Sequence, residues 1–150
     1  MTISVFTDGG SRGNPGEGAV GIVINIKDQK SKIKTEENKI IKTGKRIGIC
    51  TNNEAEYLAV IEALRQIKNE KLKFKNDEEK VEKVNFFLDS TLVCNQLNGK
   101  FKVKEPRMRE LLIKARELEG GIGVYPTYTY IPREQNSEAD KLVNQALDTL

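Results

Sequence analysis

Histidine and tryptophan are absent from this sequence of 150 residues, and cysteine occurs only twice, as Cys50 and Cys94. Because histidine and cysteine are the usual zinc ligands, a zinc site is disfavoured. A hydrolase built on a Ser-His-Asp or Cys-His arrangement is excluded. Acid–base chemistry at neutral pH must therefore come from carboxylates, lysines, tyrosines or metal-bound water. The two cysteines lack CxxC spacing, so we expect reduced thiols in a cytoplasmic protein.

Long apolar runs are missing as well. The longest, Ala19–Ile24, is far too short to cross a membrane, and no basic and then apolar N-terminal pattern predicts export. The length predicts one domain over residues 1–150. With 37% apolar and 31% charged residues, we expect a modest core beneath a highly charged surface. The net charge of +3 is weak evidence for a polyanionic partner, because solubility explains it equally well.

Hydrophobic periodicity and turn residues divide the chain into strands and helices. Strand patterns occupy Thr2–Phe6, Gly18–Lys27, Lys32–Thr43, Val84–Leu88 and Val124–Ile131. Helical patterns occupy Thr51–Glu70, Ser90–Leu97, Pro106 to the Gly120-Gly121 pair, and a last helix capped by Ser137 that reaches Leu150. The order predicts a mixed sheet with helices packed on it, which is an α/β domain.

Two connecting segments complete this pattern. A hairpin turn is expected at Lys27–Lys32, and the charged stretch Lys71–Lys83 is expected to be solvated. The stretch Gly16–Gly21 matches GxGxxG, but it opens into a predicted strand where a dinucleotide site needs a helix. We therefore reject a dinucleotide site.

Four carboxylates lie at the ends of predicted elements. Asp8 ends the first strand and opens a glycine-rich turn, and Asp89 follows the fourth strand. Since a right-handed crossover makes those strands parallel neighbours, Asp8 and Asp89 should lie side by side, at the edge where α/β sheets bind ligands. Glu56 and Asp140, each in the first turn of a helix, could close the ring. Ordinary turns and capping boxes explain the same residues, and periodicity does not choose between Glu54 and Glu56.

Four motifs in series, TDGGSRGNPG, TNNEAEYLA, FFLDS and REQNSEADKLVNQAL, resemble ribonuclease H type 1, in the style of its archaeal-like and single-domain members. The likeness covers essentially the whole chain. It implies the ribonuclease H-like fold, in which a mixed five-stranded sheet has its first three strands antiparallel, its fourth and fifth parallel to the first, and helices on both faces. It also implies that the catalytic and metal-binding carboxylates are Asp8, Glu56, Asp89 and Asp140, which leaves Glu54 as a helix cap.

The resemblance further implies an endonuclease that hydrolyses the RNA strand of RNA–DNA hybrids by two-metal-ion catalysis and leaves 5′-phosphate and 3′-hydroxyl ends. The cofactors would be two Mg²⁺ ions, with Mn²⁺ as a substitute, because such hard cations prefer oxygen ligands. Similar proteins read the 2′-hydroxyl and the duplex shape rather than the base sequence. The implied substrate contacts are Gly9, Gly10, Ser11, Asn14, Thr51, Asn52, Asn53 and Ser90.

Three departures from better-known members qualify these expectations. Ile49 stands where an arginine often precedes the threonine of a pocket for a DNA phosphate, which predicts a weaker pocket. The segment 97–120 has no room for an extra basic helix, and the basic residues of Lys100–Arg109 either compensate or form a solvated face. The loop before Asp140 has no histidine, and Arg133 is our candidate for a stand-in catalytic residue.

Two other functions remain open for the same sequence. A non-catalytic module that binds hybrids would keep the fold, but it has no need for four mutually repelling carboxylates. A different nuclease on the same fold is disfavoured by the TNN and NPG motifs. We further expect a monomer with no small-molecule cofactor and no membrane partner.

Overall fold

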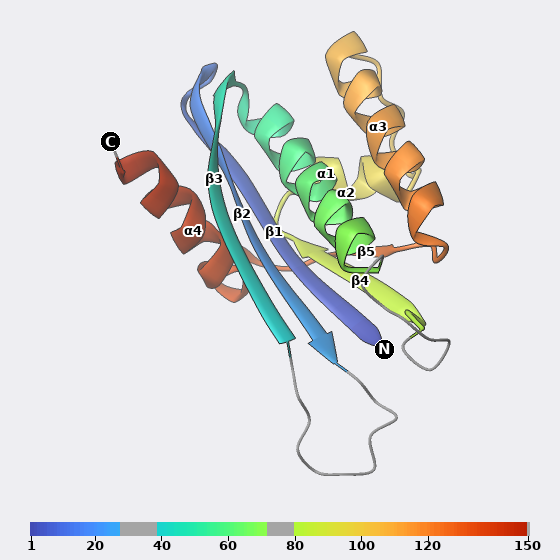
Figure 1. Cartoon of the computed structure of the whole chain (residues 1–150). Coiled ribbons are helices and arrows are strands. Elements are labelled where there is room, and N and C mark those ends of the chain that lie inside the picture. Colours follow the sequence, from blue (N-terminus) through green and yellow to red (C-terminus); the bar gives the residue numbers. More distant parts are fainter. Residues whose placement is uncertain (28–38, 72–79, 150) are drawn as a thin grey trace.

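The computed structural model describes residues 1–27, 39–71 and 80–149. Five strands form one sheet in the order β3-β2-β1-β4-β5 (Figure 1). β2 is antiparallel to both β1 and β3, whereas β4 runs parallel to both β1 and β5, as predicted. The strands are β1 (Thr2–Gly13), β2 (Gly16–Lys27), β3 (Lys39–Cys50), β4 (Lys83–Leu88) and β5 (Thr127–Tyr130). The helices are α1 (Asn52–Lys71), α2 (Thr91–Leu97), α3 (Pro106–Ile122) and α4 (Ser137–Asp148), with a short 3₁₀ helix at Arg133–Gln135.

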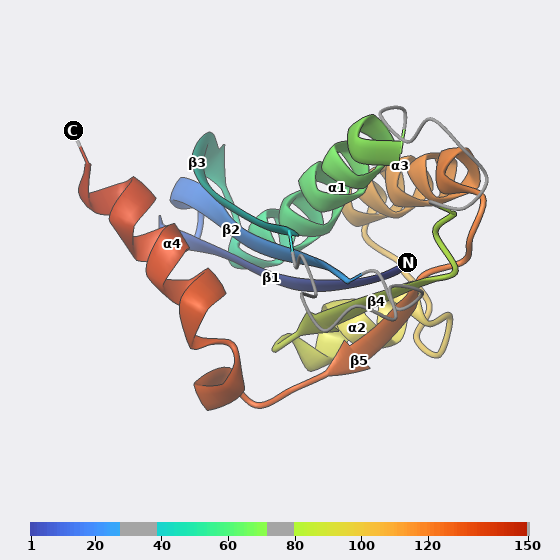
Figure 2. The same ribbon diagram turned by 60° about the horizontal axis from the view of Figure 1, so that its bottom comes forward.

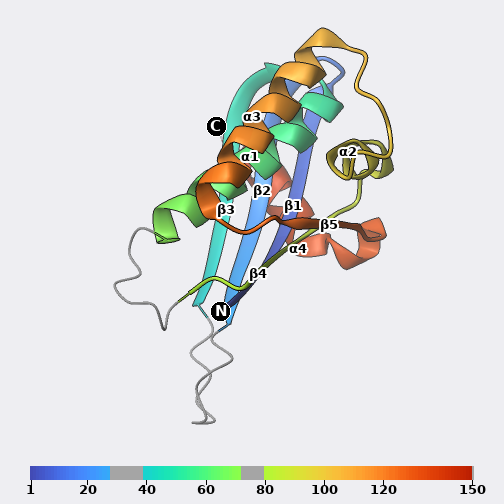
Figure 3. The same cartoon turned by 90° about the vertical axis from the view of Figure 1, so that its right-hand side faces the viewer.

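Helices cover both faces of the sheet, which confirms the expected layers. α1 and α3 lie on one face and α4 lies on the other (Figures 1, 2 and 3). The main core fills the space between the sheet and α1, α2 and α3, where Ile3 and Val5 of β1 are fully buried. A smaller cluster packs Val143 and Leu147 of α4 with Ala19 of β2. Among the described residues, no helix is both long enough and apolar enough to span a membrane.

α1 follows its sequence pattern closely. Large apolar residues recur at helical spacing and are at most 1% exposed, namely Tyr57, Val60, Ile61, Leu64 and Ile67. The helix begins with a capping box, in which Glu54 N–H donates to Thr51 Oγ1 at 3.2 Å and Thr51 N–H donates to Glu54 Oε1 at 3.1 Å. Glu54 is therefore the cap, and Glu56 is left for another role.

Two glycines allow the helices to approach the sheet at the point where acids follow. A Cβ atom on Gly9 of β1 would overlap the carbonyl group of Ala55 in α1. A Cβ atom on Gly21 of β2 would likewise overlap the carbonyl oxygen of Ala139 in α4. Each alanine directly precedes an acid, so glycine at these two positions brings the first turns of α1 and α4 down onto the sheet.

The third strand was predicted to end too early in the chain. Of the predicted Lys32–Thr43, residues 32–38 lie outside the described residues, and β3 continues past Thr43 to Cys50 because Gly44 and Gly48 do not end it. Gly44 packs closely beneath Leu142 of α4, and Gly48 has φ +83° beside a bulge in the pairing with β2. The predicted turn at Lys27–Lys32 lies almost entirely outside the described residues, as does most of the charged stretch after α1.

The predicted ends of two helices were also wrong. α3 continues through Gly120 and Gly121 to Ile122, and Gly123, with φ 84°, ends it. Asn136 rather than Ser137 occupies the N-cap position of α4. The last strand, Thr127–Tyr130, is shorter than the predicted Val124–Ile131. Leu150, where the last helix was expected to end, lies outside the described residues, and Leu147 is the last buried residue of α4.

Candidate active site

The acids meet where β1 continues beyond its neighbour β4. The parallel pairing reaches Phe6 opposite Phe87, and β4 ends one residue later. Asp8 and Asp89 lie the same distance past this pair, so they stand side by side as predicted. Asp8 does not end a strand, however, because β1 stays paired with β2 as far as Gly13. The free edge of β1 in this region leaves room for side chains from both faces of the sheet.

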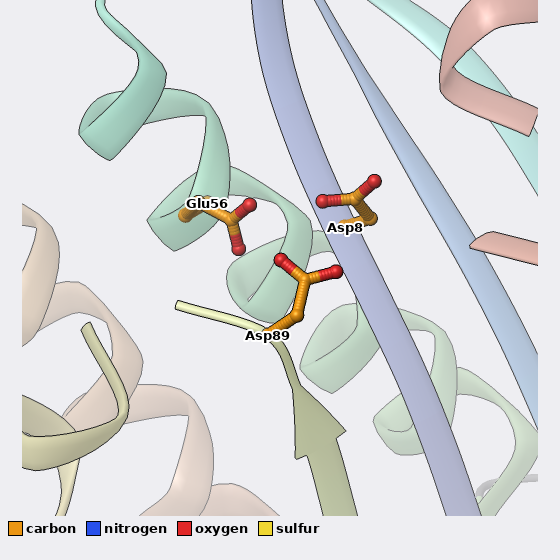
Figure 4. A group of neighbouring side chains, drawn as sticks. All are labelled: Asp8, Glu56 and Asp89. Atoms are coloured by element: carbon orange, nitrogen blue, oxygen red, sulfur yellow. The ribbon is translucent and has the colours of Figure 1, made fainter. Parts of the chain in front are cut away.

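Three carboxylates form a tight group at this edge. Asp8 of β1, Glu56 of α1 and Asp89 after β4 point toward one another (Figure 4). One oxygen of each lies within 4.8 Å of the others. The backbone N–H of Gly9 donates to Asp8 Oδ1 at 3.0 Å and to Glu56 Oε1 at 3.3 Å. The close packing of α1 on Gly9 therefore fixes two of the three acids.

The fourth acid lies beside this group but is not part of it. Asp140 is half-buried in the first turn of α4, and its Oδ2 accepts a hydrogen bond of 3.4 Å from Asn144 Nδ2. Its charge and its side-chain hydrogen bond both help to raise the pKa of Asp8. Asp8 is thus approached by Glu56 from the α1 face and by Asp140 from the α4 face.

The electrostatics of the group favour a bound cation. Burial raises the pKa of Asp8 to about 7, and the charges of Asp89 and Asp140 add to this. Burial also raises the pKa of Glu56 well above its usual value, and the Asp8 charge acts in the same direction. Glu56 Oε2 is buried and has no hydrogen-bond partner among the described residues. None of the ion pairs found in the described part of the chain joins Asp8, Glu56 or Asp89 to a lysine or arginine.

A strip of polar groups runs from the acids to the β1–β2 turn. Asn52 N–H donates to Asn14 Oδ1 at 3.0 Å, and Ser11 N–H donates to Asn52 Oδ1 at 3.0 Å. Ser11 Oγ also donates to Asn52 Oδ1, at 3.2 Å. These bonds tie the turn, with its cis Asn14–Pro15 peptide, to the start of α1.

The other predicted substrate residues differ in burial and in hydrogen bonding. Gly9 is buried against α1, whereas Gly10 is half-buried beside Val143. Ser90 caps α2, and its Oγ accepts from Val93 N–H at 3.2 Å. A surface depression of about 400 Å³ is lined by Thr51, Asn53 and Asn14 together with Arg107 and neighbours.

Arg133 is exposed in the 3₁₀ helix before α4. Its side chain makes no hydrogen bond or ion pair with the described residues, although its carbonyl oxygen accepts from Asn136 N–H at 2.9 Å. Within the described ranges its guanidinium is therefore unpaired, and no hydrogen bond or ion pair joins it to the four acids.

Two residues that sequence reasoning missed lie next to the predicted ones. Arg107 of α3 pairs with Glu54 at 3.1 Å and lines the depression. In the sequence it stands out only as one of the basic residues of Lys100–Arg109. Asn136 is 1% exposed, and its Nδ2 donates to Thr7 O at 2.8 Å and to Asp89 Oδ2 at 3.0 Å. An asparagine before a helix resembles an ordinary turn residue, so the sequence gives no clear signal for this contact.

The comparison with known proteins decides the family, because residues 1–148 match the model of the RNase H family. The chain belongs to the RNase H family. Ribonuclease HI of Halobacterium salinarum is 36% identical over 146 residues, which are 97% of this chain and 64% of that protein. The crystal structure of RNase H1 from the same organism matches with a TM-score of 0.79 at 34% identity and covers 100% of both chains.

Two further RNase H relatives show the range of the match. LC11-RNase H1, crystallised in complex with an RNA/DNA hybrid, has a TM-score of 0.79 at 34% identity and covers 97% of this chain and 96% of its own. A bifunctional protein of Mycobacterium tuberculosis is 34% identical over 148 residues, which are 99% of this chain but 36% of that protein. The chain thus spans only part of the length of these two curated relatives, 64% of the first and 36% of the second. Family and fold are those that the four motifs predicted.

Proposed function

We propose that this chain is a single ribonuclease H domain that hydrolyses the RNA strand of RNA–DNA hybrids and leaves 5′-phosphate and 3′-hydroxyl ends. The observation that carries the proposal is the convergence of Asp8, Glu56 and Asp89 within 4.8 Å, with Asp140 beside them. A binding module would gain nothing from acids that repel one another in a partly buried site. The complex of the similar LC11-RNase H1 with an RNA/DNA hybrid supports the substrate class.

The four carboxylates are the residues that would hold divalent metal ions. The fit rests on the uncompensated charge of the group, on the orphaned Oε2 of Glu56 and on a donor set made only of oxygen. Such donors favour Mg²⁺ or Mn²⁺ over softer metals. Two such ions, when bound, would neutralise the negative charge on the oxygens of the reacting phosphate and supply a nucleophile at neutral pH.

The residues of the chain have their own tasks in this chemistry. Asp8 and Glu56 must lose their protons before they can bind a cation, and the N–H of Gly9 favours the ionised form of both. Asp89 faces them from the next strand and closes the group. Because these acids come from β1, α1 and the end of β4, the packed core keeps their spacing fixed before the substrate arrives.

The polar strip and the depression beside it suit the two strands of the substrate. Ser11, Asn14 and Asn52 are held by one another, so their free polar groups are positioned for the minor groove of the hybrid. Position 49, where similar proteins often carry an arginine, is Ile49 here. Arg107 supplies the positive charge instead, because it lines the same depression as Thr51. A guanidinium there gives a DNA phosphate a charged partner.

A cleavage panel tests this function. End-labelled RNA is presented in an RNA–DNA hybrid, in an RNA duplex and as a single strand, each with Mg²⁺ and with EDTA, and a DNA duplex is run alongside. We predict cleavage of the RNA in the hybrid, only with metal. Hybrid binding without cleavage in Mg²⁺ or Mn²⁺ would favour the binding module, and cleavage of duplex DNA would favour another nuclease.

A further inference from the structure

We infer that Asn136 is a positioning residue that holds Asp89 in the geometry needed for metal binding. The inference rests on the proposed function, since it assigns a role within the same site. Asn136 belongs neither to the four acids nor to the predicted substrate contacts. It lies at the N-cap position of α4, yet its side chain makes no capping hydrogen bond.

The side chain of Asn136 bridges β1 and the residue that follows β4. Its Nδ2 donates to Thr7 O on β1 at 2.8 Å and to Asp89 Oδ2 just after β4 at 3.0 Å. The parallel ladder between β1 and β4 stops before this point, at Phe6 and Phe87. The two hydrogens of one amide thus bridge the strands where backbone pairing has ended, and one of them fixes a carboxylate.

The orientation of the amide follows from its partners. Both groups near Nδ2 are oxygens that only accept, so a flipped amide would set Oδ1 against them. In the observed orientation Oδ1 is buried and finds no partner in the part of the chain that the structure describes, while the residue is only 1% exposed. A buried orphan oxygen is unfavourable in itself. The amide is therefore held in place by its two donated bonds rather than by a fully satisfied polar environment.

Asn136 also contacts the fourth acid, Asp140, through its backbone. Its carbonyl oxygen accepts from Asp140 N–H at 3.1 Å, the bond that opens the first turn of α4. One residue thus contacts Asp89 by its side chain, the residue before Asp8 by the same side chain, and Asp140 by its backbone. Substituting the side chain leaves the backbone link to Asp140 intact, so its effect on metal binding should pass through Asp89, the acid that the side chain contacts.

The test compares Asn136→Ala with Asn98→Ala. Asn98 is a matched control, because its Nδ2 also donates to a backbone carbonyl, Tyr128 O at 2.9 Å, in a different part of the fold. We expect Asn136→Ala to weaken Mn²⁺ binding to the free protein by about 10- to 100-fold, the usual effect of losing a partner that orients a metal ligand. Calorimetry or Mn²⁺ electron paramagnetic resonance measures this without any cleavage. Asn98→Ala should keep the wild-type affinity.

A second background separates positioning from general loss of structure. In Asp89→Ala protein the carboxylate that Asn136 Nδ2 bonds is absent. Adding Asn136→Ala to that protein should therefore change Mn²⁺ affinity by less than about twofold. With a hybrid substrate, Asn136→Ala should lower kcat at fixed Mn²⁺ and leave KM near that of the wild type. Higher Mn²⁺ should restore part of the rate.

Asn136→Ser keeps the experiment decisive if the alanine variant does not fold. Serine is a favoured N-cap residue and supports the start of α4, but its single hydroxyl hydrogen cannot serve both acceptors. Wild-type Mn²⁺ affinity in Asn136→Ala or Asn136→Ser would overturn the inference, whatever the change in melting temperature. Because metal affinity is read without substrate, this result is independent of whether wild-type protein cleaves hybrids, which tests the proposed function separately.

Discussion

Asp8 and Glu56 share one hydrogen-bond donor, the N–H of Gly9, which lies 3.0 Å from Asp8 Oδ1 and 3.3 Å from Glu56 Oε1. The same glycine permits the contact, since a Cβ atom there would overlap the carbonyl of Ala55. The spacing of the two acids therefore depends on the absence of a side chain between β1 and α1.

We predict that Gly9→Ala lowers the free energy of unfolding by about 1–3 kcal/mol, because overpacking displaces α1 from the sheet. It should also weaken Mn²⁺ binding, since Glu56 moves with α1. Gly120→Ala is the control, because nothing lies within 4 Å of the Cβ it would gain in α3. Chemical denaturation measures the free energy of unfolding of both variants. Equal stability in the two variants would show that the close approach at Gly9 is not needed.

Removing one acid should stop catalysis without preventing substrate binding. We predict that Asp8→Asn or Asp89→Asn lowers the single-turnover cleavage rate by at least roughly a thousandfold, equal to about 4 kcal/mol. Hybrid binding in Ca²⁺ should largely survive, because the polar strip of Ser11 and Asn52 is unchanged. A variant that retains a tenth of the wild-type rate would remove that acid from the proposed machinery.

The pH dependence of stability follows from the raised pKa of Asp8. The folded protein holds this proton up to about pH 7, whereas the ordinary value is 3.8. Between pH 3.8 and about 7 the folded state binds more protons than the unfolded state. The proton on Asp8 therefore stabilises the folded state at the low end of this range, and this stabilisation is lost as pH rises toward 7. We predict that the metal-free melting temperature falls over this range more steeply in wild-type protein than in Asp8→Asn.

Divalent metal should reverse this trend, because the cation binds the ionised carboxylates of the folded state. Millimolar Mn²⁺ should raise the melting temperature most near pH 7 and least near pH 5. Thermal scans across pH, in EDTA and in Mn²⁺, measure both effects. A melting temperature that Mn²⁺ does not change at any pH would argue against a preformed site.

Arg107 should contribute to hybrid affinity rather than to the chemical step. We predict that Arg107→Ala raises KM by about tenfold, leaves kcat near wild type and reduces the slope of log K against log salt by about one. Its exposed pair with Glu54 adds little stability, so the fold should tolerate the change. Arg109→Ala is the control, since Arg109 bonds Val103 O and does not line the depression. Identical salt slopes in both variants would count against the phosphate contact.

Arg133 should assist turnover without being essential. Its guanidinium is exposed, stays charged at working pH and lies just before α4, so it can stabilise charge on the scissile phosphate but cannot act as a base. We predict that Arg133→Ala lowers kcat by about ten- to a hundredfold, or roughly 1.4–2.7 kcal/mol, with little change in KM. Unchanged kinetics would leave Arg133 as a solvent-exposed residue, and complete loss of activity would make it part of the essential set.

The parts of the fold that were predictable are those where local patterns and packing agree. The stripe of α1 from Tyr57 to Ile67 is buried as its spacing indicates, and Thr51 and Glu54 form the capping box. The position of Asp8 beside Asp89 followed from the right-handed crossover alone. Choosing Glu56 over Glu54 needed the resemblance, because both residues lie in the same helical turn.

The parts that were missed depend on contacts between distant segments. Gly44 and Gly48 interrupt the pattern of β3, and only the packing of α4 and a bulge against β2 explain why the strand continues. Asn136 contacts Thr7 across most of the chain, and Arg107 reaches the depression from α3. No periodicity within a single segment reports such contacts.

The most direct measurement is cleavage of an RNA–DNA hybrid by the wild-type chain, with the RNA labelled at either end and Mg²⁺ or EDTA present. We predict RNA fragments with 5′-phosphate and 3′-hydroxyl ends in Mg²⁺, an intact DNA strand, and no products in EDTA. Asp8→Asn, run at the same protein concentration, should give products at a rate at least about a thousandfold lower. An intact hybrid in both Mg²⁺ and Mn²⁺, or equal cleavage by Asp8→Asn, would contradict the proposal that these carboxylates form a nuclease site.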